Sequence, residues 1–186
     1  MQASWGKPGR WRGVRWQKGQ DADGRDSHGQ EVESPLDDLR IAIIAVDTGP
    51  KSQTSRDGMN HTVATSLLFE SWPAQAEADC AAMEQAVKEG AFAVLGPLAE
   101  ANAMAMHATM MAARPSLVYL KPQSWQVLET LWHARKNGLC AYATMDAGAN
   151  VKLIFRNAIA RDVRDVFPNA QVINPWQPHK VEDQST

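Results

Sequence analysis

The stretch TMDAGANVK, residues 144–152, places a carboxylate where a strand is expected to end and a turn is expected to begin. Apolar and β-branched residues precede Asp146, Gly148 follows two positions later, and a new apolar run begins after Asn150. On its own, an aspartate in such a place is most simply explained as a turn-stabilising residue. The functional alternative is a general base held at the mouth of a site, a role that suits a carboxylate.

A second candidate group lies at the predicted start of a helix, where residues 54–59 read TSRDGM. Thr54 or Ser55 can cap this helix, and Asp57 suits its first turn. The N–H groups of a helix N-terminus and the guanidinium of Arg56 together suit the oxygens of a phosphate or a carboxylate. A merely solvated arginine is disfavoured there, because a cation at a helix N-terminus needs an anion nearby. Ser55 as a simple N-cap remains an alternative.

The elements that position these groups follow from the spacing of apolar residues. Short apolar runs predict strands at 39–46, 116–120, 139–145, 151–155 and 171–173. Spacings of three and four predict helices from 55 towards 69, from the turn containing Pro73 to Gly90, across 95–110, at 124–137 and at 157–167. The inward positions expected in the second and third helices are Ala76, Cys80, Met83 and Val87, then Leu95, Ala99, Asn102, Met106 and Met110. This mixture predicts an α+β fold, a small, largely antiparallel sheet covered by helices on one side.

Composition narrows the class of protein. Hydrophobic residues make up 44% of the 186 residues and charged residues 22%, which is enough for a folded core. The net charge of −2 gives no global basic field towards nucleic acid. The two cysteines have no paired or metal-like spacing, which indicates reduced thiols in the cytoplasm. No apolar run reaches the ~20 residues of a membrane span, and no signal-peptide pattern precedes the core, so neither a membrane nor export is expected.

The composition shifts near Pro35. The residues before it are rich in Gly, Trp, Arg and Asp, which predicts an edge piece or a loosely ordered arm over residues 1–35. Residues 36–178 are expected to form the main domain and residues 179–186 a tail. The tryptophans, arginines and lysines of the first twenty residues have the ingredients of single-strand nucleic acid binding. Acidic residues follow at once, so we do not expect a nucleic acid partner.

Two further motifs invite functional interpretations that the sequence does not favour. His107 lacks a second ligand at metal-binding spacing, so it is expected to be a core or interface histidine, and no metal-ligating residue is assigned. The run Asp26-Ser27-His28 contains the residue types of a catalytic triad, but triad members are rarely neighbours in sequence. We reject that interpretation.

Four segments in order carry a family resemblance. They are TSRDGMNHTVATS at 54–66, EANAMAMHATMMAARPSLVYL at 100–120, AYATMDAGANVKLIF at 141–155 and FPNAQVINPW at 167–176. Together they resemble diphosphomevalonate decarboxylases of the GHMP kinase superfamily. RWQKGQDADGRDSHG, at 15–29, resembles the stretch that ends the N-terminal domain in bacterial members. The resemblance begins near Trp11 and implies a GHMP kinase C-terminal-type domain, preceded by a remnant of the N-terminal one.

The resemblance implies a reaction of the mevalonate route to isoprenoids. Diphosphomevalonate and ATP, with Mg²⁺, give isopentenyl diphosphate, CO₂, ADP and phosphate, which makes the family enzyme a carbon–carbon lyase. The catalytic carboxylate of the family motif T-x-D-A-G-x-N falls on Asp146. Ser55 and Arg56 match the family's Ser-Arg substrate motif. Met59 is expected one helical turn further on, against the apolar part of the substrate.

The sequence departs from the family pattern in two ways. Ala149 stands where the family turn usually has proline. The family enzyme is about twice this length, and we find no counterpart of its lysine motif or of its Gly/Ser-rich phosphate loop. The chain is therefore expected to be a C-terminal portion that needs the missing half for activity and that dimerises as family members commonly do. The alternatives are a non-catalytic remnant or interaction module, or a related mevalonate-phosphate kinase or decarboxylase.

Overall fold

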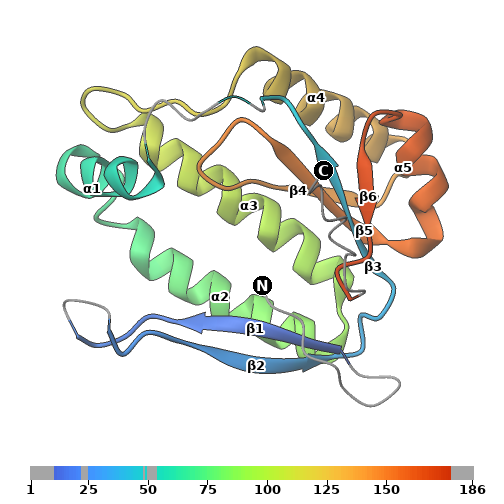
Figure 1. The fold of residues 1–186 in the computed structure, drawn as a ribbon, viewed down its shortest axis with the longest axis horizontal. Coiled ribbons are helices and arrows are strands. Elements are labelled where there is room, and N and C mark those ends of the chain that lie inside the picture. Colours follow the sequence, from blue (N-terminus) through green and yellow to red (C-terminus); the bar gives the residue numbers. More distant parts are fainter. Residues whose placement is uncertain (1–10, 22–24, 48, 50–53, 177–186) are drawn as a thin grey trace, which may run out of the picture.

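The computed structural model describes residues 11–21, 25–47, 49 and 54–176 (Figure 1). Along the chain the elements are β1 (Trp11–Gln17), β2 (His28–Ser34), β3 (Leu39–Ile44), α1 (Ser55–Thr65), α2 (Trp72–Glu89), α3 (Phe92–Met111), α4 (Pro122–Lys136), β4 (Ala141–Thr144), β5 (Val151–Arg156), a 3₁₀ turn η1 (Asn157–Ile159), α5 (Ala160–Val166) and β6 (Gln171–Ile173). This arrangement confirms the α+β class. None of the helices in the described part of the chain is long and apolar enough to cross a lipid bilayer.

The main sheet has the order β4-β5-β3-β6, and each neighbouring pair is antiparallel. Leu153 of β5 lies opposite Ala42 of β3 and Ala143 of β4, so these three side chains share one face. That face packs against Leu128 of α4 and Val163 of α5, and all five residues are inaccessible to solvent. The sheet therefore has a dry core on this side.

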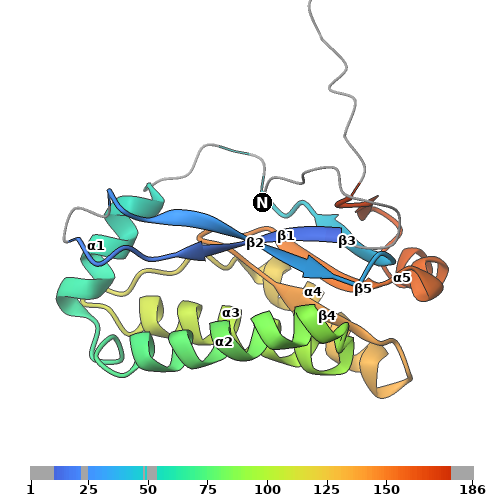
Figure 2. The same cartoon turned by 90° about the horizontal axis from the view of Figure 1, so that it is seen from below.

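The opposite face of the sheet is also covered. Ile154 of β5 points away from that core, as does its partner Tyr142 of β4. Both residues cluster with Phe92 and Leu95 of α3. Figure 2 shows α2 and α3 together on one side of the strands. The expectation of helices on one side only was therefore incomplete, since helical residues contact both faces.

Helix α3 is buried on more than the predicted stripe. Leu95 and Met110 are buried as predicted, but Gly96, Ala103 and His107 are buried too, while the other three predicted positions are only half-buried. The reason is that α3 packs against both α2 and β4. At Gly96 the contact is so close that a Cβ atom would lie 2.2 Å from the Tyr142 ring.

Helix α2 shows a related difference from the expected pattern. All four predicted inward residues are half-buried, and the most buried positions are Asp79 and Ala86. This helix contacts α3 and also β2, so its buried surface is broader than one stripe. The carboxylate of Asp79 accepts hydrogen bonds from the side chains of Gln75 at 2.7 Å and Asn102 at 3.0 Å, which satisfies a buried charge.

Three predicted elements differ from the structure. Residues 116–120 form no strand, because this segment packs against α1, where Leu117 and Tyr119 close over Gly58. Helix α1 ends at Thr65, since the Ser66 hydroxyl donates to the carbonyl of Thr109 and fixes a turn there. Finally, β1 and β2 form a regular antiparallel hairpin where a loosely ordered arm was the alternative prediction.

The hairpin is tied to α2 by ion pairs between Arg15 and Glu84 and between Lys18 and Glu77. Val32 and Ser34 of β2 are also buried, and the Ser34 hydroxyl donates to the carbonyl of Val87 on α2 at 2.7 Å. Residues 1–10, which contain part of the tryptophans, arginines and lysines discussed above, and the predicted tail at 179–186 lie outside the described residues.

Glu100 of α3 makes contacts that link α3 to helix α4 and to strand β4. Its carboxylate accepts two hydrogen bonds from the guanidinium of Arg135, at 2.9 and 2.6 Å, and one from the indole of Trp132 at 3.0 Å. A fourth comes from the backbone N–H of Ala143 at 2.8 Å. The guanidinium also lies 4.3 Å from the ring centroid of Tyr142. Helices α3 and α4 and strand β4 are thereby fixed to one another.

Candidate functional site

The start of α1 presents Ser55 and Arg56 to solvent. Thr54 is the N-cap: its hydroxyl oxygen accepts the backbone N–H of Asp57 at 3.1 Å, and its hydroxyl group donates to the Asp57 carboxylate at 2.6 Å. Ser55 is therefore the first helical residue, and its interpretation as the N-cap is wrong. Ser55 and Arg56 are both exposed, and among the described residues neither has a hydrogen-bonding or ionic partner. Both side chains are available for a ligand.

Helix α1 is held in place by a close approach to the segment before α4. A Cβ atom at Gly58 would lie 2.3 Å from the Tyr119 hydroxyl and 2.9 Å from Leu117, so glycine is required for this contact. Met59 follows and remains 42% exposed. Its side chain lines a small apolar cavity together with Met106 of α3, among others. The position of Met59 next to the exposed helix start is compatible with contact to an apolar part of a ligand.

Asp146 lies at the end of β4 on a tight turn. The N–H of Gly148 donates to the Asp146 carbonyl at 2.7 Å, and both Gly148 and Ala149 are buried. The Asp146 side chain is 64% exposed, and the ammonium of Lys152 donates to its Oδ2 atom at 3.0 Å. The backbone of the turn is thus packed into the protein while its carboxylate faces outwards.

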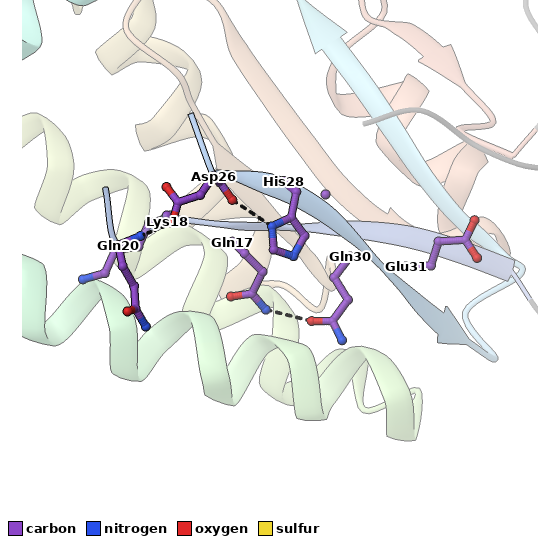
Figure 3. Close-up of a pocket in the computed structure, with 9 residues that line it drawn as sticks. Gln17, Lys18, Gln20, Asp26, His28, Gln30 and Glu31 are labelled. Carbon is purple, nitrogen blue, oxygen red and sulfur yellow. Dashed lines mark hydrogen bonds between the residues drawn. The ribbon is translucent and has the colours of Figure 1, made fainter. Parts of the chain in front are cut away.

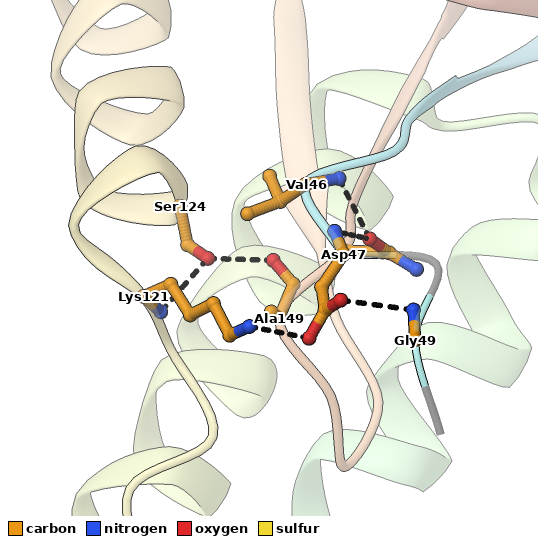
Figure 4. Close-up of polar contacts among 7 residues, drawn as sticks. Val46, Asp47, Gly49, Lys121, Ser124 and Ala149 are labelled. Atoms are coloured by element: carbon orange, nitrogen blue, oxygen red, sulfur yellow. Dashed lines mark hydrogen bonds and ion pairs between the residues drawn. The ribbon is translucent and has the colours of Figure 1, made fainter. Parts of the chain in front are cut away.

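Asn150 fixes this turn to the end of β3. Its side-chain oxygen accepts the backbone N–H groups of Val46 at 2.7 Å and Asp47 at 2.9 Å (Figure 4). The Asn150 of the sequence motif therefore acts by bridging two segments that are about a hundred residues apart in sequence. Since the side chain satisfies two backbone donors at once, it holds the turn in one conformation.

A second set of contacts fixes the turn to the start of α4. The Ser124 hydroxyl donates to the Ala149 carbonyl at 2.6 Å and accepts the N–H of Lys121 at 3.1 Å (Figure 4). The Lys121 ammonium lies 2.5 Å from the carboxylate of Asp47. The hydrogen bond from Lys121, followed by one from the N–H of Gly49, holds the pKa of Asp47 below its ordinary value. The turn is thereby supported by the end of β3 and the start of α4. Neither contact was predicted from the sequence.

His107 supports the Asp146 turn from α3. It is 2% exposed, which confirms that it is a core histidine. Burial lowers the pKa of His107 below its ordinary value, although a hydrogen bond with the backbone of Asp146 and the charge of its carboxylate act in the opposite direction. Its Nε2 atom has no hydrogen-bonding partner among the described residues. The imidazole is therefore neutral and lies against the backbone of Asp146.

The structure brings the two candidate groups to one end of the molecule. Figures 1 and 2 both show the turn between β4 and β5 pointing towards the end at which α1 lies. Helix α3 contacts both groups, through Met106 beside Met59 and through His107 beside Asp146. Sequence reasoning missed the contact of Lys152 with Asp146. The antiparallel register that sets Lys152 opposite Thr144 would have placed it beside the turn.

The hairpin carries a separate polar groove, shown in Figure 3. The carboxylate of Asp26 accepts the N–H groups of Gln20 at 2.5 Å and Asp21 at 3.2 Å. The hydrogen bond from Gln20 is the main reason that the pKa of Asp26 is lowered. The His28 ring contacts the backbone carbonyl of Asp26 at 3.0 Å. This carboxylate closes a loop, which supports the rejection of a triad here.

Comparison with known proteins points to the segment that contains both candidate groups. A family model described as the mevalonate 5-diphosphate decarboxylase C-terminal domain matches residues 41–184. The chain is 32% identical over 142 residues to diphosphomevalonate decarboxylase of Homo sapiens, covering 74% of this chain and 36% of the human protein. It is 31% identical over 148 residues to diphosphomevalonate decarboxylase mvd1 of Aspergillus fumigatus, covering 76% of this chain and 36% of that protein.

Solved structures agree with these relatives. Mevalonate pyrophosphate decarboxylase from Streptococcus pyogenes matches with a TM-score of 0.70 and 34% identity, covering 76% of this chain and 45% of that one. A structure of MDDEF in complex with MVAPP, AMPPCP and magnesium matches with a TM-score of 0.79 and 29% identity, covering 86% of this chain and 50% of that one. The chain thus spans 36% of the length of these curated relatives and about half of these solved ones.

Proposed function

Because the chain belongs to the mevalonate 5-diphosphate decarboxylase family, we propose that it supplies the substrate-binding helix and the catalytic carboxylate of an ATP-dependent diphosphomevalonate decarboxylase. The reaction would convert diphosphomevalonate and ATP into isopentenyl diphosphate, CO₂, ADP and phosphate. One observation carries this proposal. In the turn of the T-x-D-A-G-x-N motif, Gly148 and Ala149 are buried and the backbone is held by Asn150 and Ser124, whereas Asp146 is exposed.

Asp146 would act on the tertiary hydroxyl of the substrate. A carboxylate within hydrogen-bonding reach of that hydroxyl orients its oxygen towards the phosphoryl group and accepts its proton during phosphoryl transfer. The rigid turn matters because such transfer depends mainly on the placement of groups and charges. The buried Gly148 and Ala149 hold the backbone on which that placement depends.

The start of α1 would bind the anionic part of the same substrate. Arg56 is an exposed cation at the positive end of a helix dipole, a position that an anion stabilises. The guanidinium can donate two parallel hydrogen bonds to a carboxylate or diphosphate, and the Ser55 hydroxyl can add a third. Met59, one turn further on, would contact the apolar part of diphosphomevalonate.

ATP would be a co-substrate bound mainly by residues outside this sequence, and Mg²⁺ would accompany it. Among the described residues, no group of three or more His, Cys, Asp or Glu side chains could hold a metal ion. A related structure that holds AMPPCP and magnesium is about twice as long as the matched part. We also propose that the chain divides at residue 35, forms a homodimer and is located in the cytoplasm.

The test is a complemented assay. The chain is mixed with a separately expressed polypeptide that carries the ATP-binding part of a family enzyme, and release of CO₂ and ADP from diphosphomevalonate is measured. We expect both products in equal amounts from the mixture and neither from the two components assayed separately. A folded chain that yields no CO₂ in the mixture would contradict the proposal and favour a non-catalytic role.

A further inference from the structure

Lys152 is the residue in direct contact with the candidate catalytic carboxylate. Its ammonium lies 3.0 Å from Oδ2 of Asp146. Lys152 is on β5 directly opposite Thr144, two residues before Asp146, so the β-sheet register fixes where the lysine side chain starts. The lysine side chain is 34% exposed and that of Asp146 is 64% exposed. Lys152 is therefore the more buried partner of the pair.

The other titratable groups around the turn do not replace this cation. His107, from α3, is buried and neutral, because burial lowers its pKa. Lys121, at the start of α4, is already paired with Asp47 at 2.5 Å. Asp47 itself, after β3, is an anion. Among the charged side chains that the described elements bring to this turn, Lys152 is the cation that forms an ion pair with Asp146.

This ion pair is poorly explained as a contribution to fold stability. Exposed pairs of this kind contribute little to the free energy of unfolding, because water and salt screen them. The same contact has a larger consequence for chemistry, since it restricts the orientation of a carboxylate and favours its ionised form. Both properties are what a general base requires.

We propose that Lys152 is a positioning residue for Asp146, which orients the carboxylate and keeps it ionised for proton abstraction. The inference rests on the proposed function of Asp146. The pair has a consequence for the pH dependence of the reaction. Without the ammonium, the carboxylate takes up a proton at a higher pH, so the acidic limb of the kcat/KM profile must move to higher pH.

The test compares three variants in the complemented assay. Lys152→Met removes the charge and keeps most of the side-chain length, whereas Lys152→Arg keeps a cation. Lys88→Met is the matched control, because Lys88 forms a comparable pair with Glu84 on α2 at 2.6 Å, outside the candidate site. Both lysine side chains are partly exposed in the wild type, so thermal unfolding temperatures should fall by no more than a few degrees.

We expect Lys152→Met to lower kcat by roughly tenfold and to move the acidic limb upwards by roughly 0.5–1 pH unit. Lys152→Arg should restore the position of the limb, and Lys88→Met should match the wild type. A profile for Lys152→Met that coincides with the wild type would overturn the proposal. So would an equal shift in Lys152→Met and Lys152→Arg, because the charge would then not be responsible.

A second measurement separates this proposal from the proposed function. The carboxyl carbon of Asp146 is followed by ¹³C NMR during a pH titration of the chain alone, in wild type and Lys152→Met. We expect the midpoint to move upwards in Lys152→Met, and an unchanged midpoint would overturn the inference whatever the activity. Absence of turnover by the wild type in the complemented assay, with a shifted NMR midpoint, would count against the proposed function and leave the ion-pair effect standing.

Discussion

Asp146→Asn is expected to lower kcat of the complemented enzyme by about 10³-fold, within the range that a general base contributes. Asparagine has nearly the same shape as aspartate, so the turn held by Asn150 and Ser124 should be kept. The amide cannot accept the proton of the substrate hydroxyl, and it forms no ion pair with Lys152. The affinity for diphosphomevalonate should stay within about threefold, because Asp146 acts mainly in the transition state.

The control for this variant is Asp162→Asn, an exposed aspartate on α5. It removes the same charge at a distant position, so kcat should be unchanged. Initial rates of CO₂ release over a range of substrate concentrations separate kcat from KM. If Asp146→Asn retained more than a tenth of the wild-type kcat, Asp146 would not be the catalytic carboxylate.

Arg135→Met is expected to lower the free energy of unfolding by about 3 kcal/mol, the scale for breaking a largely buried ion pair. It leaves the carboxylate of Glu100, whose side chain is 13% exposed, without its two guanidinium hydrogen bonds. Methionine keeps much of the apolar stem, so the loss reports the charge more than the packing. Urea denaturation followed by circular dichroism gives the free energy of unfolding.

The matched control is Arg161→Met on α5. Arg161 and Asp165 are 3.9 Å apart, with side chains 92% and 70% exposed, so this substitution should change stability by less than about 0.5 kcal/mol. Equal effects of the two substitutions would show that Glu100 and Arg135 do not hold α3, α4 and β4 together.

The same pair predicts a dependence of stability on pH. Burial acts to raise the pKa of Glu100, but hydrogen bonds from Arg135, the N–H of Ala143 and Trp132 outweigh it and hold the pKa below the ordinary value of 4.5. A carboxyl whose folded-state pKa is lowered contributes stability that is fully present above its unfolded pKa. That stability is lost as the pH falls below 4.5 through the folded-state pKa. Arg135→Met should flatten the decline in that acidic range.

Helices, strands and turns were predicted best where the pattern of residues that indicates them is local in the sequence. The β4–turn–β5 unit around Asp146 was correctly placed because apolar runs flank a glycine turn. Gly90 ends α2 in the left-handed conformation, with φ 71°, as its position predicted. Residues 116–120 were misassigned because the apolar run is satisfied by α1 and not by a sheet, and periodicity alone does not distinguish those partners.

The residues of the candidate site could be predicted from the sequence, but the contacts that hold them in place could not. Asp146, Ser55 and Arg56 stand in motifs that are continuous in sequence. The contact of Asn150 with the end of β3, and that of Ser124 with Ala149, join segments far apart in the chain. Only the register of the folded sheet shows that Lys152 reaches Asp146. The assignment of Thr54 as the cap, in place of Ser55, likewise depends on backbone geometry.

The most direct measurement is an isothermal titration of the purified chain with diphosphomevalonate, beside Arg56→Ala and the control Arg161→Ala. We expect one-to-one binding by the wild type and by Arg161→Ala. Arg56→Ala should weaken binding by roughly 10- to 100-fold, because hydrogen bonds to a charged group contribute about 1.5–3 kcal/mol. No binding by a chain that circular dichroism shows to be folded, or equal binding by Arg56→Ala, would contradict the assignment of the substrate site to α1.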